Sequence, residues 1–131
     1  MAELQDSKEQ RELDGRRRQK TVTIVGVCGS GKTLLSEGLK QLGYEARSVS
    51  QEHSLVPDLF ARSRPDIVIY LETADGTVAR RRQTGWEPGQ LARQRQRLKL
   101  ARDRADIHIS TDGLEPEELL MKAIKELESG F

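Results

Sequence analysis

The segment GVCGSGKT, from Gly26 to Thr33, constrains this chain more than any other part of its sequence. It matches the pattern G-x-x-x-x-G-K-[ST], in which glycines let consecutive backbone N–H groups curl around a phosphate. In this pattern the lysine, here Lys32, reaches the β- and γ-phosphates, and the next residue, Thr33, ligates Mg²⁺. The sequence therefore predicts a nucleoside triphosphate and Mg²⁺ as cofactors. The residues expected to bind them are Gly26, Val27, Cys28, Gly29, Ser30, Gly31, Lys32, Thr33 and Leu34.

The residues on either side of this segment have the pattern that such a loop needs. The preceding run KTVTIV, residues 20–25, is short, β-branched and apolar, which is typical of a buried parallel strand. After the loop, leucines recur at helical spacing, and Gly43 follows them at the position of a helix cap. These leucines are Leu34, Leu35, Leu39 and Leu42. The helix would add its positive N-terminal end to the phosphate site.

The rest of the chain alternates strand-like and helix-like segments. Further strands are expected at residues 44–50, 67–71 and 106–110. Further helices are expected at residues 74–82, at 89–104, and from Pro116 onward. This alternation predicts a compact three-layer α/β fold, with helices on both faces of a mainly parallel sheet of about four strands.

Length and composition set the organisation of the chain. Its 131 residues suit one domain, which we place at residues 20–131. Residues 1–19 are almost entirely polar and are expected to form a charged, disordered arm. No apolar run reaches membrane-spanning length, so we expect a cytoplasmic protein with no membrane partner. The single cysteine, Cys28, fits a reducing compartment.

Several segments together resemble the small P-loop kinases, which phosphorylate nucleotides, nucleosides, shikimate, gluconate and similar metabolites. The resemblance is carried by GVCGSGKT, by YLET at residues 70–73, and by RLKLARDRAD leading to IHIST at residues 97–111. It implies a P-loop fold and transfer of the γ-phosphoryl group of ATP-Mg to a small acceptor. The preference for ATP over GTP comes from this resemblance alone, because the chain has no N-K-x-D motif.

The chain also departs from the pattern of these kinases. Only residues 51–65 separate the second predicted strand from the third, so a central strand and most of the acceptor pocket are expected to be missing. The acidic residue that ordinarily ends a Walker B strand is also missing, since Asp66 stands at the start of its strand. Ligands of parallel α/β sheets bind beyond the carboxyl ends of the strands.

The same rule selects the residues that follow the second predicted strand. If that strand packs directly beside the first, Glu52 comes close to the site expected for Mg²⁺ and the γ-phosphate. We therefore predict Glu52 as a metal-associated acid or general base, with His53 as a weaker alternative. The competing interpretation is that both residues belong to a surface turn.

Arginines crowd the stretch from Arg80 to Arg104 and indicate a lid over the transferred phosphoryl group. We predict catalytic roles for Lys32, Glu52, Arg81, Arg82 and Arg93. The competing interpretation of the arginines is a solvated basic face.

Three classes of function remain open from the sequence. The first is a kinase-like phosphotransferase acting on a metabolite or nucleotide. The second is a nucleotide-binding switch with slow or no hydrolysis, which the short acceptor region favours. The third is a nucleic-acid-binding protein, and the net charge of +1 and the small aromatic content argue against it. A neighbouring subunit could complete the pocket, so the oligomeric state is open, as is the identity of the acceptor.

Overall fold

The computed structural model describes residues 20–81 and 89–130. It contains one four-stranded sheet with the strand order β2-β1-β3-β4, in which every neighbouring pair is parallel. The predicted α/β class and parallel sheet are therefore confirmed. The strands are β1 (Thr21–Gly26), β2 (Glu45–Ser48), β3 (Ile67–Glu72) and β4 (Ile107–Ser110).

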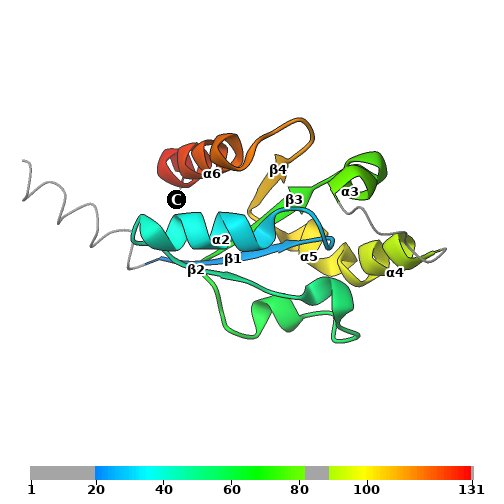
Figure 1. The fold of residues 1–131 in the computed structure, drawn as a ribbon. Helices are drawn as coiled ribbons and strands as arrows, with labels where there is room; N and C mark the ends of the chain where they lie inside the picture. The colour runs from blue at the N-terminus through cyan, green and yellow to red at the C-terminus, as the bar shows by residue number, and fades with distance from the viewer. Residues whose placement is uncertain (1–19, 82–88, 131) are drawn as a thin grey trace, which may run out of the picture.

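Helices cover both faces of this sheet (Figure 1). The longer helices α2 and α6 lie over one face, and α3, α4 and α5 belong to the other side. The α-helices are α2 (Lys32–Gln41), α3 (Asp75–Arg81), α4 (Gln90–Arg97), α5 (Lys99–Arg104) and α6 (Pro116–Gly130). Two short 3-10 helices, η1 (Gln51–His53) and η2 (Leu59–Ala61), lie between β2 and β3.

The two apolar cores follow from the alternation of side chains along the central strands. Val22 and Ile24 of β1 pack with Leu35 and Leu39 of α2 and with residues of α6. Val25, on the opposite face, packs with residues of β3, α3 and α5 in a second core. Strand β3 is buried on both faces, which explains why the sequence of this strand is a continuous apolar run.

The direct pairing of β1 with β2 brings the segment after β2 beside the segment after β1. Ile24 is paired with Ser48, and Val49 donates its backbone N–H to the carbonyl of Ile24. The condition on which the Glu52 prediction depended is therefore met. At the amino-terminal ends of β1 and β3, Asp66 accepts hydrogen bonds from the backbone N–H and the hydroxyl of Thr21, at 2.8 and 3.2 Å. Asp66 thus lies away from the carboxyl ends of the strands.

Two details of the helices could not be read from the helical spacing. Leu34 is 58% exposed, whereas Leu35 and Leu39 of the same helix are buried in the core. The single helix predicted at residues 89–104 is divided at Leu98 into α4 and α5. The N–H of Leu98 bonds to the carbonyls of both Gln94 and Arg95, as in a final helical turn, while its side chain is fully buried.

Some predictions are only partly covered by the described residues. The charged arm at 1–19 and the lid residue Arg82 lie outside them. The second strand is shorter than predicted, and the last helix begins at Pro116 as predicted. Among residues 20–81 and 89–130, no helix has the length and apolar character needed to cross a membrane.

Candidate functional site

The segment Gly26–Thr33, here called the glycine loop, joins β1 to α2 at the carboxyl end of the sheet. Its turn depends on glycines at two positive-φ positions, Gly29 (φ 88°) and Gly31 (φ 100°). The backbone N–H of Ser30 bonds to the carbonyl of Val27 at 3.0 Å and closes the turn. Because the first N–H groups of a helix have no partner within it, the start of α2 presents donors to the loop.

Gly26 is required for a different reason, which is the close approach of neighbouring atoms. A Cβ atom at this position would lie 2.7 Å from Ser30 Oγ and 3.2 Å from the carbonyl oxygen of Leu71. Strand β3 therefore packs directly against the backbone at the beginning of the loop. Any larger residue would therefore require the Ser30 side chain or the adjacent part of β3 to move.

Lys32 and Glu52 form a buried ion pair that joins the glycine loop to η1. The Glu52 side chain is 1% exposed and the Lys32 side chain is 12% exposed. A carboxylate so deeply buried needs a positive partner, and Lys32 provides it. The pair brings together two residues that the sequence analysis assigned to one site, although they lie twenty positions apart.

Two buried oxygen atoms of this region have no hydrogen-bond partner in the described part of the chain. They are Oε1 of Glu52 and Oγ of Ser30. Unpaired buried acceptors are costly in a folded protein and are satisfied by a ligand, an ion or water. These atoms are therefore buried polar groups at or beside the glycine loop that a polar ligand would stabilise.

Arg81, at the end of α3, also binds the backbone of the glycine loop. Its guanidinium donates to the carbonyls of Gly29 and Ser30, each at 3.3 Å. It also donates to the side-chain hydroxyl of Thr111 at 3.2 Å and to the Thr111 carbonyl at 2.8 Å. Arg81 therefore ties the loop to the segment that follows β4.

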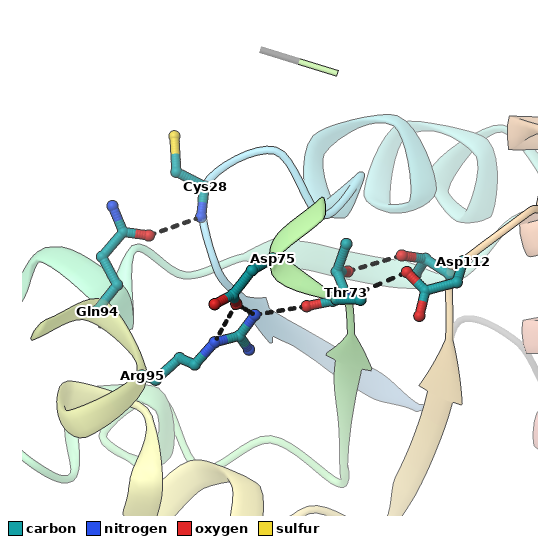
Figure 2. A network of polar contacts seen from close by, with 8 residues as sticks. Cys28, Thr73, Asp75, Gln94, Arg95 and Asp112 are labelled. Carbon is teal, nitrogen blue, oxygen red and sulfur yellow. Dashed lines mark hydrogen bonds and ion pairs between the residues drawn. The ribbon is translucent and has the colours of Figure 1, made fainter. Parts of the chain in front are cut away.

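A third contact to the loop comes from α4 (Figure 2). The side-chain oxygen of Gln94 accepts a hydrogen bond from the backbone N–H of Cys28 at 3.0 Å. The neighbouring residue Arg95 donates to the carbonyl of Thr73 at 2.6 Å and forms an ion pair with Asp75. Helix α4 is thus attached both to the glycine loop and to the segment after β3.

The ends of β3 and β4 are joined by short polar side chains. The hydroxyls of Thr73 and Thr111 lie 2.6 Å apart, and both residues are buried. Asp112 accepts the backbone N–H of Ala74 at 3.0 Å (Figure 2). Hydrogen bonds from Thr77 and from the Ala74 N–H lower the pKa of Asp112 below its usual range, because both stabilise the carboxylate.

A cavity of about 520 Å³ opens beside the glycine loop. The loop residues Gly29 to Gly31 and the side chain of Arg81 form one part of its wall, and Leu114, Glu115 and Pro116 form another. Leu34 and Leu119 also line it, which gives the exposed Leu34 a position at the site. The cavity therefore combines polar loop backbone with apolar and proline surface.

The structure brings together some of the predicted site residues and separates others. Glu52 and Arg81 both contact the glycine loop, whereas the His53 side chain is exposed. Arg93 lines a different hollow between α4, α5 and the segment after η1. Thr33, the predicted Mg²⁺ ligand, is exposed at the start of α2. The described residues contain no group of three or more His, Cys, Asp and Glu side chains arranged to hold a metal ion.

Three residues of the site were not predicted from the sequence. Gln94, Thr111 and Arg95 contact the loop or its supporting segments. The position of Thr111 directly after a strand was a usable signal, because ligands gather at the carboxyl ends of parallel strands. Gln94 gave no such signal, since a glutamine in a polar helix resembles any exposed residue.

Comparisons of the whole chain with family models and with curated proteins find no match in either case.

Proposed function

We propose that the protein binds a nucleoside triphosphate with Mg²⁺ through the glycine loop and transfers its γ-phosphoryl group to a small acceptor. The single observation that carries this proposal is the Lys32–Glu52 pair at the carboxyl ends of β1 and β2. A loop that matches the phosphate-binding pattern thus has its lysine directly beside a buried acid. Phosphoryl transfer requires these two kinds of group near one phosphate.

The ion pair determines which contact nucleotide binding would break. The phosphates of the nucleotide offer Lys32 a new anionic partner, while the glycine loop and the start of α2 supply backbone N–H donors. When Lys32 turns to the phosphates, the Glu52 carboxylate is released for one of two roles, as the base that accepts a proton from an acceptor hydroxyl or as a ligand of Mg²⁺. In either role, Lys32 stabilises the negative charge of the phosphates.

The residues around the loop fit a magnesium ion as the companion of the nucleotide. Glu52 has an unpaired buried oxygen, and the Thr33 side chain is exposed at the start of α2. Carboxylate and hydroxyl oxygens are the ligands that Mg²⁺ takes together with substrate phosphates. When bound, the ion would neutralise charge on the β- and γ-phosphates, with Glu52 and Thr33 as the residues that hold it.

The cavity beside the loop gives the rest of the nucleotide a place to bind. Arg81 and Pro116 stand on its wall together with the backbone of Gly29 to Gly31. A planar guanidinium and a proline ring are suitable surfaces for the flat face of a base. We assign the cavity to the nucleoside part and leave the choice between ATP and GTP to measurement.

A second candidate function is a nucleotide-loaded switch with little or no turnover. This function is favoured by two contacts that nucleotide binding would disturb. The glycine loop contacts Glu52 of η1 and Gln94 of α4. A nucleotide that displaces Glu52 from Lys32 would alter contacts of the η1 segment and of α4. Nucleotide-driven switches depend on this kind of change, in which binding exchanges one set of contacts for another.

An acceptor screen distinguishes the two candidates. Purified protein with ATP-Mg is incubated with sets of small hydroxyl compounds, and ADP release is measured with and without each acceptor. A phosphotransferase gives ADP release that depends on one class of acceptor. Saturable nucleotide binding without acceptor-dependent release supports the switch. Absence of nucleotide binding removes both.

A further inference from the structure

A second hollow, separate from the cavity beside the glycine loop, lies between α4, α5 and the segment after η1. Its volume is about 560 Å³. Three cationic residues line it, Arg93, Arg97 and Lys99, with Asp103 as the acidic residue of its wall. Leu55, Pro57 and Leu100 supply an apolar wall. We call this hollow the arginine groove.

The three cations of the arginine groove have no carboxylate partner among the described residues, so the groove carries excess positive charge. In the described part of the chain, Arg95 and Arg102 pair with Asp75 and Glu72, whereas Arg93, Arg97 and Lys99 form no ion pair. Arg97 is half-buried, and its guanidinium donates at 3.4 Å to a neutral carbonyl, that of Glu52. A partly desolvated guanidinium bound only to a carbonyl is a favourable partner for an anion.

The wall that faces these cations is held in place by a buried glutamine. The side chain of Gln51 is fully buried and donates to the carbonyl of Val56 at 2.8 Å. Its oxygen accepts the backbone N–H of Phe60 at 2.9 Å, and its nitrogen also donates to the carbonyl of Arg97 at 3.4 Å. The groove therefore has a preformed shape, and a ligand need not first order the segment.

One residue outside both sites, Glu52, contacts the glycine loop and a residue of the groove. Glu52 pairs with Lys32 through its carboxylate and accepts the Arg97 guanidinium through its main-chain carbonyl. Glu52 therefore links the groove to the glycine loop.

We propose that the arginine groove binds a small organic anion, with its phosphate or carboxylate group on Arg97 and Arg93 and its apolar body against Leu55 and Leu100. The identification of this anion as the phosphoryl acceptor rests on the proposed function. The binding site itself does not, because its residues are distinct from the glycine loop.

The test is a titration followed by the backbone amide signals of the ¹⁵N-labelled full chain. Phenyl phosphate and benzoate are the two probes, and benzyl alcohol is the neutral control. Amides of Leu55, Arg97 and Leu100 report on the groove, and amides of Gly29 and Gly31 report on the glycine loop. We expect saturable shifts of the groove signals with at least one anion and none with the alcohol. The anion that binds more tightly shows whether the groove prefers a phosphate or a carboxylate group.

Matched variants make the result specific to the site. Arg97→Gln is expected to weaken anion binding at the groove signals at least about fivefold, and Arg93→Gln to weaken it less, because Arg93 is more exposed. Arg62→Gln is the control, since Arg62 is an exposed cation that pairs with Asp58 outside the groove. It should leave the groove affinity unchanged. Thermal unfolding verifies that each variant is folded.

Two outcomes would overturn the assignment. One is an absence of saturable groove shifts with either anion, or equal shifts with benzyl alcohol. The other is an equal loss of affinity in Arg62→Gln and in both groove variants, which would mean general charge attraction. ATP-Mg is titrated separately and read at Gly29 and Gly31, so failure of nucleotide binding is seen independently of the groove.

Discussion

Lys32 and Glu52 form an ion pair across two segments of the chain, with the carboxylate almost completely shielded from solvent. The lysine belongs to the first turn of α2, and the glutamate belongs to η1 after β2. Their contact exists because β2 pairs directly with β1 in the sheet. The pair holds the glycine loop in place and sets the charge that a bound phosphate would have to displace.

Removal of one partner of this pair should destabilise the fold. Lys32→Ala leaves the Glu52 carboxylate buried without a cation, and loss of one partner of a buried pair costs about 3–5 kcal/mol. The double variant Lys32→Met with Glu52→Leu removes both charges and should recover most of the stability without recovering nucleotide binding. Urea unfolding measures the free energy of unfolding of each variant. A single variant as stable as the wild type would show that the pair contributes nothing to the fold.

Gly26 should tolerate no side chain. In Gly26→Ala the added Cβ meets Ser30 Oγ at 2.7 Å and the backbone of Leu71 at 3.2 Å, so the Ser30 side chain and the neighbouring strand must move. We expect a loss of about 1–3 kcal/mol in unfolding free energy and a reduced affinity for ATP-Mg. Gly76→Ala in α3 is the control, because the nearest heavy atom to its Cβ is 3.6 Å away. Equal behaviour of the two variants would contradict the close approach at Gly26.

Arg81 and its neighbour Arg80 should behave differently. Arg81 donates to two carbonyls of the glycine loop, whereas Arg80 donates to the hydroxyl of Thr77. Arg81→Ala is therefore expected to lower ATP-Mg affinity about tenfold or more, since it frees the loop from Thr111. Arg80→Ala should change the affinity less than twofold. Calorimetric titration compares them, and similar affinities in both variants would remove Arg81 from the site.

Gln51 should act as the organiser of the segment between β2 and β3. Gln51→Leu leaves the carbonyl of Val56 and the N–H of Phe60 without their side-chain partner, at a cost of about 1–3 kcal/mol. Gln41→Leu, at an exposed position of α2, is the control. The measurement is hydrogen exchange of the amides at residues 54–60. Unchanged protection in Gln51→Leu would mean that the segment is held by other contacts.

Asp112 should make the free energy of unfolding depend slightly on pH in the acidic range. Its pKa is lowered in the folded state, so its contribution is present above the pKa of the unfolded chain, near pH 4, and is lost as the pH falls through the folded pKa. The wild type should therefore be more stable than Asp112→Asn at neutral pH. The difference should shrink below pH 4. A difference independent of pH in urea unfolding would contradict the pKa shift.

The sequence predicted the parts of the fold that depend on local patterns. The strand, loop and helix around GVCGSGKT were predicted because their apolar spacing and glycines act within a few residues. The position of Glu52 was predicted conditionally, and it depended on β2 pairing with β1, which no local pattern determines. The site role of Glu52 stays a prediction.

The details that local patterns could not show have long-range causes. Leu34 follows helical spacing, yet it lines the cavity beside the glycine loop rather than the core, because the sheet and α6 cover the opposite side of α2. At the break, the Leu98 side chain is buried in the second core, which includes residues of β1 and β3 that lie far from it in the sequence. Gln94 and Gln51 are indistinguishable from exposed glutamines until the fold gives them backbone partners.

The most direct test of the proposed function is calorimetric titration of ATP and of GTP, with and without Mg²⁺, into the wild type and into the double variant Lys32→Met with Glu52→Leu, once urea unfolding has verified that this variant is folded. We predict magnesium-dependent, saturable binding of at least one nucleotide to the wild type and a loss of at least about a hundredfold in the double variant. Absence of binding by the wild type, or equal binding by both proteins, would contradict the assignment of the glycine loop as a nucleotide site.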